Sequence, residues 1–243
     1  MFLINKFILF YNFSLTRINK GLRFKIKIDL QTLLLRNSKT KPFVFIQVGA
    51  NDGISHDSLF SFVKERKVFG LLIEPVKDYY EKLCDNYIDI QNVIKINKAV
   101  HPNLKEVLMY KVDPNKEAQL PEWAGGIASI YEDHHKKSNI PADVIVIEKV
   151  EADSLMNIVL TNNFPYNIDL IQIDVEGFDF EVIKMIDFSR ISCKLIKFEW
   201  VNLSIDTKKE SIKYLRNKGF YLFDENNDTI AVNLNLAKIY NIF

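Results

Sequence analysis

Cysteine is nearly absent from this chain, and the two that occur suit neither a disulfide framework nor a metal site. Among 243 residues only Cys84 and Cys193 are present, with no Cys-X-X-Cys or Cys/His spacing. A reducing, cytoplasmic location is therefore expected. No stretch reaches the roughly 18–20 apolar residues of a membrane span. The apolar start, residues 1–13, lacks a small-residue cleavage site, so no signal peptide is predicted.

Glycine and proline are also few, at 8 and 7 residues, and no repeat, low-complexity tract or Gly/Ser linker divides the chain. The composition is globular, with 48% hydrophobic and 26% charged residues. This length suffices for one sizeable α/β domain with a small extension. We therefore predict a domain over residues 42–243 and an extension over residues 1–41.

The extension and the domain carry opposite charge. Residues 1–41 contain nine Lys or Arg and one acid, a net charge of +8, while the remainder carries −7. Apolar residues recur at helical spacing within the basic part. Such a helix either packs on the domain with a solvated basic face, which we expect, or lies on the anionic inner face of a membrane as a peripheral contact. No nucleic-acid partner is expected, because no aromatic residues interleave with the basic ones in a binding motif.

From residue 42 onward, apolar segments typical of strands alternate with segments of helical periodicity. Strands separated by helices form a parallel sheet, whereas two strands joined by a tight turn pair antiparallel. Strands are predicted at residues 44–48, 68–73, 93–96, 106–112, 144–150, 169–174, 194–200, 220–223 and 229–232. Helices are predicted from near residue 57, at 77–87, after 177 and at 207–218, the last opened by a capping box at 207–210. The predicted fold is a Rossmann-like α/β fold, a mostly parallel sheet with helices on both faces and a C-terminal antiparallel hairpin.

A glycine loop follows the first strand, in the segment Gly49-Ala50-Asn51-Asp52-Gly53. Its position between a strand and a helix lets backbone N–H groups approach a small molecule closely. Glu74 comes 21 residues after Gly53, at the end of the second strand. A carboxylate there suits the two hydroxyls of a ribose. The loop and the acid together predict an adenosine-containing ligand.

Two acids, Asp174 and Glu176, follow the strand at residues 169–174, at the sheet edge where open α/β folds bind ligands. Alternation along an extended chain places both side chains on the same side. Such a pair can bind a cationic ligand, act as general base or hold a divalent metal. The alternative without a functional role is an acidic helix N-terminus stabilised by the macrodipole.

The connection over residues 113–141 is long for a loop, and long loops are usually functional or disordered. Its Gly-Gly pair and Ser129 suit contact with a ligand, with an ordinary turn as the alternative. Trp123 suits either stacking on a ring or packing as a satellite core. His134 and His135 are adjacent and so do not form a chelating pair, and no metal ligands are predicted. Glu199 lies at the end of the strand at 194–200. It has either a structural role or a role in the site, where it would bind the substrate or position a residue that does.

Seven short motifs occur in a characteristic order over residues 42–233: Gly-Ala-Asn-Asp-Gly, Ile-Glu-Pro, Asn-Lys-Ala-Val, Gly-Gly-Ile-Ala-Ser, Ala-Asp-Ser-Leu, Ile-Asp-Val-Glu-Gly and Phe-Glu-Trp. In this order the chain resembles the FkbM family of S-adenosylmethionine-dependent O-methyltransferases. The resemblance implies a class I methyltransferase fold, S-adenosylmethionine as cofactor and methyl transfer to a hydroxyl, often on a sugar or a polyketide. The extension, residues 1–41, has no counterpart in it.

The resemblance also implies roles for residues at matching positions. The glycine loop would wrap the methionine part of the cofactor, Glu74 would hold the ribose, and residues near Ala99 would border the adenine. Gln47 stands where many methyltransferases carry an acid, so it offers a carbonyl acceptor without charge. The predicted cofactor-binding residues are Gln47, Gly49, Asn51, Asp52, Gly53, Glu74, Pro75, Ala99 and Ser129.

Methyl transfer to an alcohol requires in-line alignment and removal of the hydroxyl proton. The predicted catalytic residues are Asp174 or Glu176 as general base, with His56 as the less favoured base. The expected acceptor is a small molecule or a cell-envelope glycan with a free hydroxyl. Two alternatives are a metal-dependent glycosyltransferase that uses Asp174 and Glu176, and a non-catalytic member of the fold that binds a partner through the extension.

Overall fold

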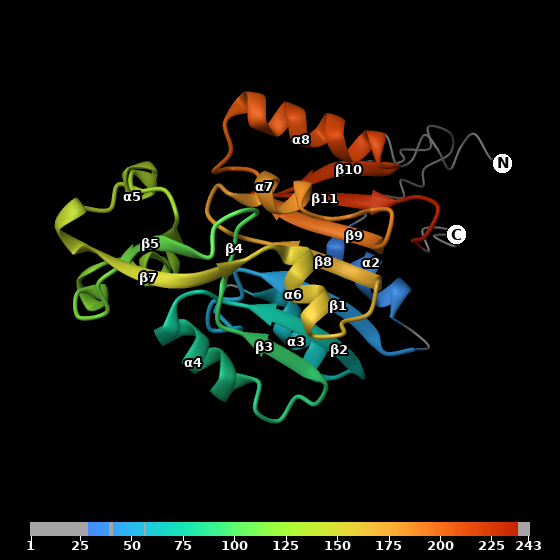
Figure 1. The fold of residues 1–243 in the computed structure, drawn as a ribbon, viewed down its shortest axis with the longest axis horizontal. Coiled ribbons are helices and arrows are strands. Elements are labelled where there is room, and N and C mark those ends of the chain that lie inside the picture. Colours follow the sequence, from blue (N-terminus) through green and yellow to red (C-terminus); the bar gives the residue numbers. More distant parts are fainter. Residues whose placement is uncertain (1–28, 39–40, 56, 238–243) are drawn as a thin grey trace, which may run out of the picture.

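The computed structural model describes residues 29–38, 41–55 and 57–237. Within these residues a central sheet carries helices on both faces, and a smaller sheet projects from one side, at the left of Figure 1. Among the described helices none combines the length and apolar character that a bilayer span requires.

The central sheet has seven strands in the order β10-β11-β9-β8-β1-β2-β3. The strands β9, β8, β1, β2 and β3 pair with one another in parallel. The strand β11 is antiparallel to both of its neighbours, β9 and β10. The strands are β1 (Phe43–Val48), β2 (Val68–Ile73), β3 (Val93–Ile96), β8 (Asn167–Ile173), β9 (Ser192–Glu199), β10 (Phe220–Glu225) and β11 (Asp228–Asn233). The predicted parallel sheet with a terminal hairpin is confirmed.

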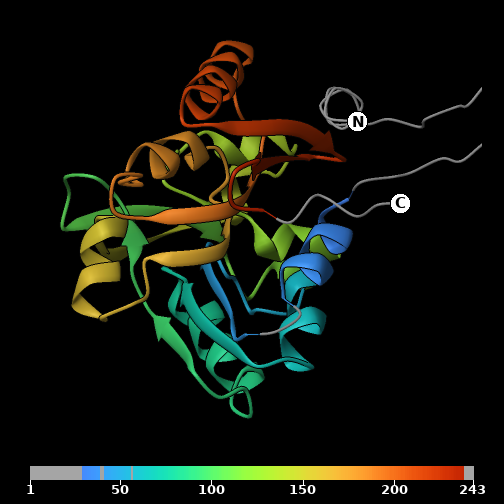
Figure 2. The same ribbon diagram turned by 90° about the vertical axis from the view of Figure 1, so that its right-hand side faces the viewer.

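Two apolar clusters, one on each face, hold the sheet between its helices (Figure 2). Phe45 of β1 belongs to one cluster and Ile46 to the other, because successive strand residues point to opposite faces. The first face carries α2 (Leu30–Asn37), α3 (Ser58–Lys64) and α4 (Lys77–Asn86), and the second carries α6 (Leu155–Thr161), α7 (Asp179–Lys184) and α8 (Ile205–Asn217).

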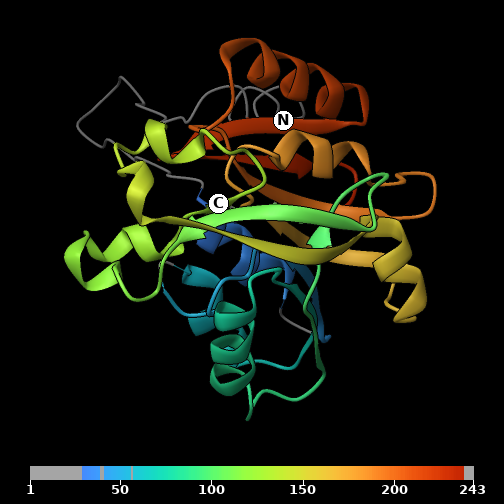
Figure 3. The same cartoon turned by 60° about the vertical axis from the view of Figure 1, so that its left-hand side comes forward.

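The smaller sheet has the order β4-β7-β5-β6, with the long strands β5 and β7 antiparallel and side by side (Figure 3). Its strands are β4 (Ala99–Val100), β5 (Glu106–Val112), β6 (Ala128–Ser129) and β7 (Ile145–Asp153). We call residues 113–141, between β5 and β7, the strap. The strap was predicted as a long loop; it contains the short strand β6 and three short helical segments: η1 (Glu117–Gln119), η2 (Glu122–Gly126) and α5 (His134–Lys137). A fourth, η3 (Ala142–Val144), follows it.

Two segments differ from the sequence-based expectation or refine it. The helix predicted from Thr207 begins at Ile205, because Ser204 is its N-cap and accepts a hydrogen bond from the Thr207 amide at 3.1 Å. Within the predicted extension, α2 packs Leu33 and Leu34 into the apolar cluster of the first face. Residues 1–28 of the extension lie outside the described residues.

Candidate functional site

A cavity of about 540 Å³ lies at the carboxyl ends of the parallel strands, and part of the strap covers it. Gly49 borders it after β1, Glu74 after β2, Asp174 after β8 and Glu199 at the end of β9, while Gly126 contributes from the strap. The volume is in the usual range for a site that encloses a small organic ligand. The parallel strands therefore bring the predicted acids and the glycine loop to one place.

The glycine loop owes its shape to the close approach of two main chains. Gly49 has a φ of +77°, and a Cβ atom there would lie 1.8 Å from the carbonyl oxygen of Asp174. Gly53 also has a φ of +77°, but a Cβ there would meet Leu83 and Tyr87 at 2.5 and 2.6 Å, on the side of α4. Gly49 borders the cavity, whereas Gly53 makes room for core packing behind the loop.

The amide groups of this loop already have acceptors within the chain. The amides of Gly49 and Ala50 donate to the Ile73 carbonyl at 2.9 and 3.1 Å, and the Asn51 amide donates to Glu74 Oε2 at 2.8 Å. Asp52 turns its carboxylate onto the amides of the next turn and does not border the cavity. A ligand can therefore pack against the loop, but the amides of Gly49, Ala50 and Asn51 are not the free N–H donors that the sequence suggested.

Glu74 closes the wall of the cavity after β2 and is only 4% exposed. Its Oε2 accepts the Asn51 amide, and its Oε1 accepts the Val76 amide, both at 2.8 Å. Burial raises the pKa of Glu74 to about 7. Each oxygen keeps a second lone pair, so the carboxyl group can still accept hydrogen bonds from a ligand.

Two glutamines form a polar floor under the loop. Gln47 of β1 and Gln172 of β8 are neighbours in the sheet, and their amide nitrogens donate to Asp57 at 3.0 and 3.4 Å. The Oε1 atoms of both glutamines are buried and have no hydrogen-bond partner among the described residues. A buried acceptor without a donor is costly, and both glutamines border the cavity. Their carbonyl oxygens suit a ligand that carries an N–H donor, such as an ammonium group.

Asp174 and Glu176 both border the cavity, although not for the reason predicted. The strand β8 ends at Ile173, and Glu176 has a φ of +52°, so strand alternation does not place them. Asp174 is exposed toward the cavity, and the surrounding protein reduces the solvation of its carboxyl group. This environment and the nearby Glu176 raise the pKa of Asp174 to about 7.

Side chains from two other segments hold Glu176. Its Oε2 accepts hydrogen bonds from His134 Nε2 of the strap and from Asn202 Nδ2 after β9, both at 2.8 Å. The same Asn202 amide donates to Glu199 Oε2 at 2.5 Å. Burial, together with the nearby Asp174 and Glu176, raises the pKa of Glu199 to about 8. Asn202 thus joins two carboxyl groups at one end of the cavity.

A further acid, Asp179, supports this end of the cavity from behind and is fully buried. It accepts hydrogen bonds from the Gly177 amide at 3.2 Å and the Glu199 amide at 3.3 Å. Burial raises the pKa of Asp179 well above its usual range. The excess of carboxyl groups over cations makes the cavity suited to a positively charged ligand.

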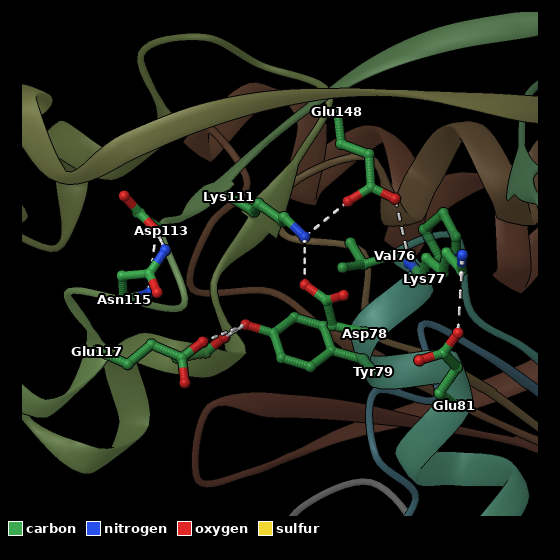
Figure 4. Close-up of polar contacts among 12 residues, drawn as sticks. Val76, Lys77, Asp78, Tyr79, Glu81, Lys111, Asp113, Asn115, Glu117 and Glu148 are labelled. Carbon is green, nitrogen blue, oxygen red and sulfur yellow. Dashed lines mark hydrogen bonds and ion pairs between the residues drawn. The ribbon is translucent and has the colours of Figure 1, made fainter.

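Polar contacts between α4 and the small sheet hold the strap over the cavity (Figure 4). Lys111 of β5, only 8% exposed, lies between Asp78 Oδ2 at 2.9 Å and Glu148 Oε2 at 2.6 Å. The Tyr79 hydroxyl donates to the Gly125 carbonyl of the strap and lies 3.2 Å from Glu117 Oε1. These contacts connect α4, which follows Glu74 in the chain, to the small sheet and to the strap that covers the cavity.

Most of the predicted site residues border one cavity, but not all. Ser129 is buried behind it and donates its hydroxyl to the Glu176 carbonyl at 3.0 Å. His56 lies outside the described residues. Asp52, Gly53 and Ser129 do not border the cavity, whereas the following predicted residues do: Gln47, Gly49, Asn51, Glu74, Pro75, Ala99, Asp174 and Glu176.

Sequence reasoning missed Gln172, His134 and Asn202. A polar residue inside an otherwise apolar strand was the available signal for Gln172. The contacts of His134 and Asn202 with Glu176 span 42 and 26 residues, so no local pattern indicates them. In the described part of the chain no group of three or more His, Cys, Asp or Glu side chains is placed to hold a metal ion.

The sequence profile of the Methyltransferase FkbM domain matches residues 47–222, which is most of the chain. The match covers the central sheet except the first part of β1, the end of β10 and the whole of β11. The chain belongs to the FkbM methyltransferase family. Its seven-stranded sheet, with β11 antiparallel between β10 and β9, is that of a class I S-adenosylmethionine-dependent methyltransferase. Family membership decides against the glycosyltransferase alternative.

Two solved structures illustrate what this chain is similar to. The precorrin-6y C5,15-methyltransferase of Geobacter metallireducens is 12% identical with a TM-score of 0.41, and the match covers 83% of this chain and 87% of that one. The fibrillarin pre-rRNA processing protein of Methanococcus jannaschii is 15% identical with a TM-score of 0.40, over 88% and 86%. Similarity of this degree carries no argument about the acceptor. No curated protein matches the sequence.

Proposed function

We propose that this FkbM protein transfers a methyl group from S-adenosylmethionine to a hydroxyl of a sugar, a glycan or a secondary metabolite. The supporting observation is the cavity that joins an acid-rich wall to two buried, unpartnered glutamine oxygens. S-adenosylmethionine carries a sulfonium and an ammonium group, so it supplies the positive charge and the N–H donors that these groups lack.

The cofactor end of the cavity would be formed by the loop and the polar floor. Glu74 would accept the ribose hydroxyls, while Oε1 of Gln47 and of Gln172 would accept the methionine ammonium group. Pro75 and Ala99 would border the adenine. Asp52, Gly53 and Ser129 would keep the surrounding loops in position without contacting the cofactor.

The acceptor end would be formed by Asp174, Glu176 and Glu199. When bound, the cofactor supplies a methyl group activated by the sulfonium. Asp174 is the favoured general base, because a carboxyl group with a pKa of about 7 and an open face can accept a hydroxyl proton near neutral pH. Glu176 is the second candidate. Trp123, 46% exposed, borders the cavity from the strap and provides an aromatic face on which a sugar ring or the adenine can stack.

The extension suggests where the acceptor is found. With a net charge of +8 over residues 1–41, it would bring the catalytic domain to the inner face of an anionic membrane. A lipid-linked or cell-envelope glycan is the acceptor that such a location favours. Binding of the full chain to vesicles that contain anionic lipid, compared with neutral vesicles, tests this part separately.

The proposal is tested by calorimetric titration of S-adenosylmethionine and by transfer of its labelled methyl group. The acceptor panel consists of free hexoses, 6-deoxyhexoses and their methyl glycosides. We expect micromolar binding of the cofactor, about 8 kcal/mol, and label in at least one panel sugar. Asp174→Asn should bind the cofactor and lose most of the transfer. A protein that binds no cofactor would support the non-catalytic alternative, and normal turnover by both Asp174→Asn and Glu176→Gln would exclude either residue as the base.

A further inference from the structure

His134 of the strap contacts the side chain of Glu176 from behind the acceptor end of the cavity. It begins the four-residue helix α5, and its side chain is 1% exposed. Its Nε2 lies 2.8 Å from Glu176 Oε2, while its Nδ1 is buried with no hydrogen-bond partner among the described residues. A buried ring nitrogen without a partner is costly. The ring of His134 is thus oriented so that Nε2 contacts Glu176, although Nδ1 then lacks a hydrogen bond.

The two donors to Glu176 converge on one carboxylate oxygen. His134 Nε2 and Asn202 Nδ2 both bind Oε2, and no described residue hydrogen-bonds Oε1. Glu176 borders the cavity, so Oε1 is the oxygen left for a ligand. A carboxylate held by one oxygen has a fixed orientation for the other.

The main chain of Glu176 is also held in a conformation that few residues adopt. Its φ of +52° lies in the left-handed region, and the Ser129 hydroxyl donates to its carbonyl oxygen at 3.0 Å. A non-glycine residue in this region persists when surrounding contacts impose it, and such residues cluster at functional sites. The strap supplies both the main-chain contact and the side-chain contact.

We infer that His134 is a positioning residue for methyl transfer, which directs Glu176 Oε1 toward the acceptor hydroxyl. The inference rests on the proposed function. Since a carboxylate oxygen accepts, the Nε2 atom of His134 that faces Glu176 is the donor and carries a proton. In the transfer step the acceptor oxygen bonds to the methyl carbon as the carbon–sulfur bond breaks, and the hydroxyl proton passes to a carboxyl group that faces it. His134 itself touches neither cofactor nor acceptor and acts through Glu176.

Three variants of the full chain separate positioning from folding. His134→Leu removes the donor, whereas His134→Gln replaces it with an amide N–H at a similar reach. His135→Gln is the matched control on the same helix, because the His135 ring contacts the Ile140 carbonyl and not Glu176. Each variant is assayed for S-adenosylmethionine affinity by calorimetry and for kcat and KM with the panel sugar that the wild type methylates fastest.

We expect His134→Leu to lower kcat by about 10²-fold, the effect of a small misplacement of a reacting group, with the cofactor Kd changed less than twofold. His134→Gln should recover most of the lost kcat, and His135→Gln should resemble the wild type. Equal rates for His134→Leu and wild type, or an equal loss in His135→Gln, would overturn the inference.

A spectroscopic reading needs no acceptor. In protein labelled with ¹⁵N-histidine, His134 should carry a proton on Nε2. The Nε2 signal of His134 should shift in the Glu176→Leu variant and stay unchanged in the His135→Gln variant. An Nδ1–H tautomer at His134, or a signal insensitive to Glu176→Leu, would contradict the inference even in an active enzyme. A wild-type protein that binds no cofactor would instead contradict the proposed function, so the two failures are distinguishable.

Discussion

Gly49 is the residue at which the smallest change should have the largest effect. An added methyl group at this position would overlap the Asp174 carbonyl oxygen, and the φ of +77° disfavours any side chain. Gly219 is the natural control, because its φ of +87° is similar and a Cβ there would have no atom within 4 Å. The pair therefore separates main-chain strain from steric exclusion.

We predict that Gly219→Ala lowers the free energy of unfolding by about 1–2 kcal/mol, the usual cost of a left-handed non-glycine residue. Gly49→Ala should cost more and abolish measurable S-adenosylmethionine binding, since β1 and β8 must separate to accommodate the methyl group. Urea denaturation and calorimetry measure the two quantities. Similar losses in both variants would mean that the contact with Asp174 is unimportant.

Glu74 carries the second prediction for a single residue. Glu74→Ala removes the acceptor for the Asn51 and Val76 amides as well as the proposed ribose contact. Hydrogen bonds to a charged group are worth about 1.5–3 kcal/mol, so the cofactor Kd should rise about tenfold or more. Glu81→Ala, on the exposed side of α4, is the control. Unchanged affinity in Glu74→Ala would place the ribose elsewhere.

How far single residues could be predicted depends on how local their determinants are. Glu74 and Asp174 were found because each directly follows an apolar strand, and parallel strands end at one edge. His134 reaches the site only through the path of the strap, which no periodicity encodes. The Gln47 oxygen was recognised as an acceptor, but its buried and unpartnered state depends on Asp57 and could not be inferred.

The strap is the element whose attachment matters most for ligand binding. On the side of α4, the Tyr79 hydroxyl donates to the Gly125 carbonyl of the strap. Beside it, Lys111 of β5, the strand that leads into the strap, joins Asp78 and Glu148 (Figure 4). At the acceptor end, His134 contacts Glu176, and Lys137 Nζ donates to the Asn202 carbonyl at 2.8 Å. These side-chain contacts hold the strap at both ends, in addition to the main-chain pairing of β6 with β5.

We predict that Lys111→Met loosens the attachment of β5 to α4 and thereby the strap that follows β5, because it leaves two carboxylates facing each other without a cation. Since Asp78 and Glu148 are partly solvated, the cost should be about 1–2 kcal/mol, below the range for a fully buried pair. Limited proteolysis should cut residues 113–141 faster, and S-adenosylmethionine should slow the cutting. Lys149→Met, which removes an exposed pair with Glu106, should stay within about 0.5 kcal/mol of wild type. Equal proteolysis of the two variants would argue against this anchor.

Elements were predictable where they are long and periodic. The strand at residues 106–112 agrees with β5, and the helix at 77–87 ends within one residue of α4. The helices of the strap were missed, because segments of three to five residues show no apolar period. The start of α8 was placed at Thr207 because Thr207 and Glu210 match a capping box, whereas Ser204 is the residue that caps it.

The protein contains acids with raised pKa values, and these acids destabilise the fold as the pH rises. Carboxyl groups with lowered pKa values, the more common case, instead destabilise a fold as the pH falls. Burial raises the pKa of Glu74 to about 7 and that of Glu199 to about 8. Between the ordinary carboxyl pKa near 4 and these values, the folded protein keeps protons that the unfolded chain has released. By linkage, their contribution to stability is present below about pH 4 and is lost as the pH rises through about 7–8.

We predict that Glu199→Gln stabilises the ligand-free protein at pH 8.5 and has little effect at pH 5. The amide keeps the hydrogen bond from Asn202 and removes a charge next to Asp174 and Glu176. A gain of about 1 kcal/mol corresponds to a rise in Tm of about 2–4 °C for a domain of this size. Thermal denaturation at both pH values measures it, with the exposed Glu65→Gln as control. A larger rise at pH 5 than at pH 8.5 would reverse the assigned sign.

The unequal exposure of the two ends of the cavity has a consequence for kinetics. Gln47 and Glu74 are 2% and 4% exposed, whereas Val201, next to the Asn202 that contacts Glu176, is 49% exposed. A ligand at the inner end must therefore enter past the place where the second ligand sits. We expect a compulsory order of addition, in which the methyl donor enters first and S-adenosylhomocysteine leaves last. Product-inhibition patterns would then show S-adenosylhomocysteine competing with S-adenosylmethionine alone.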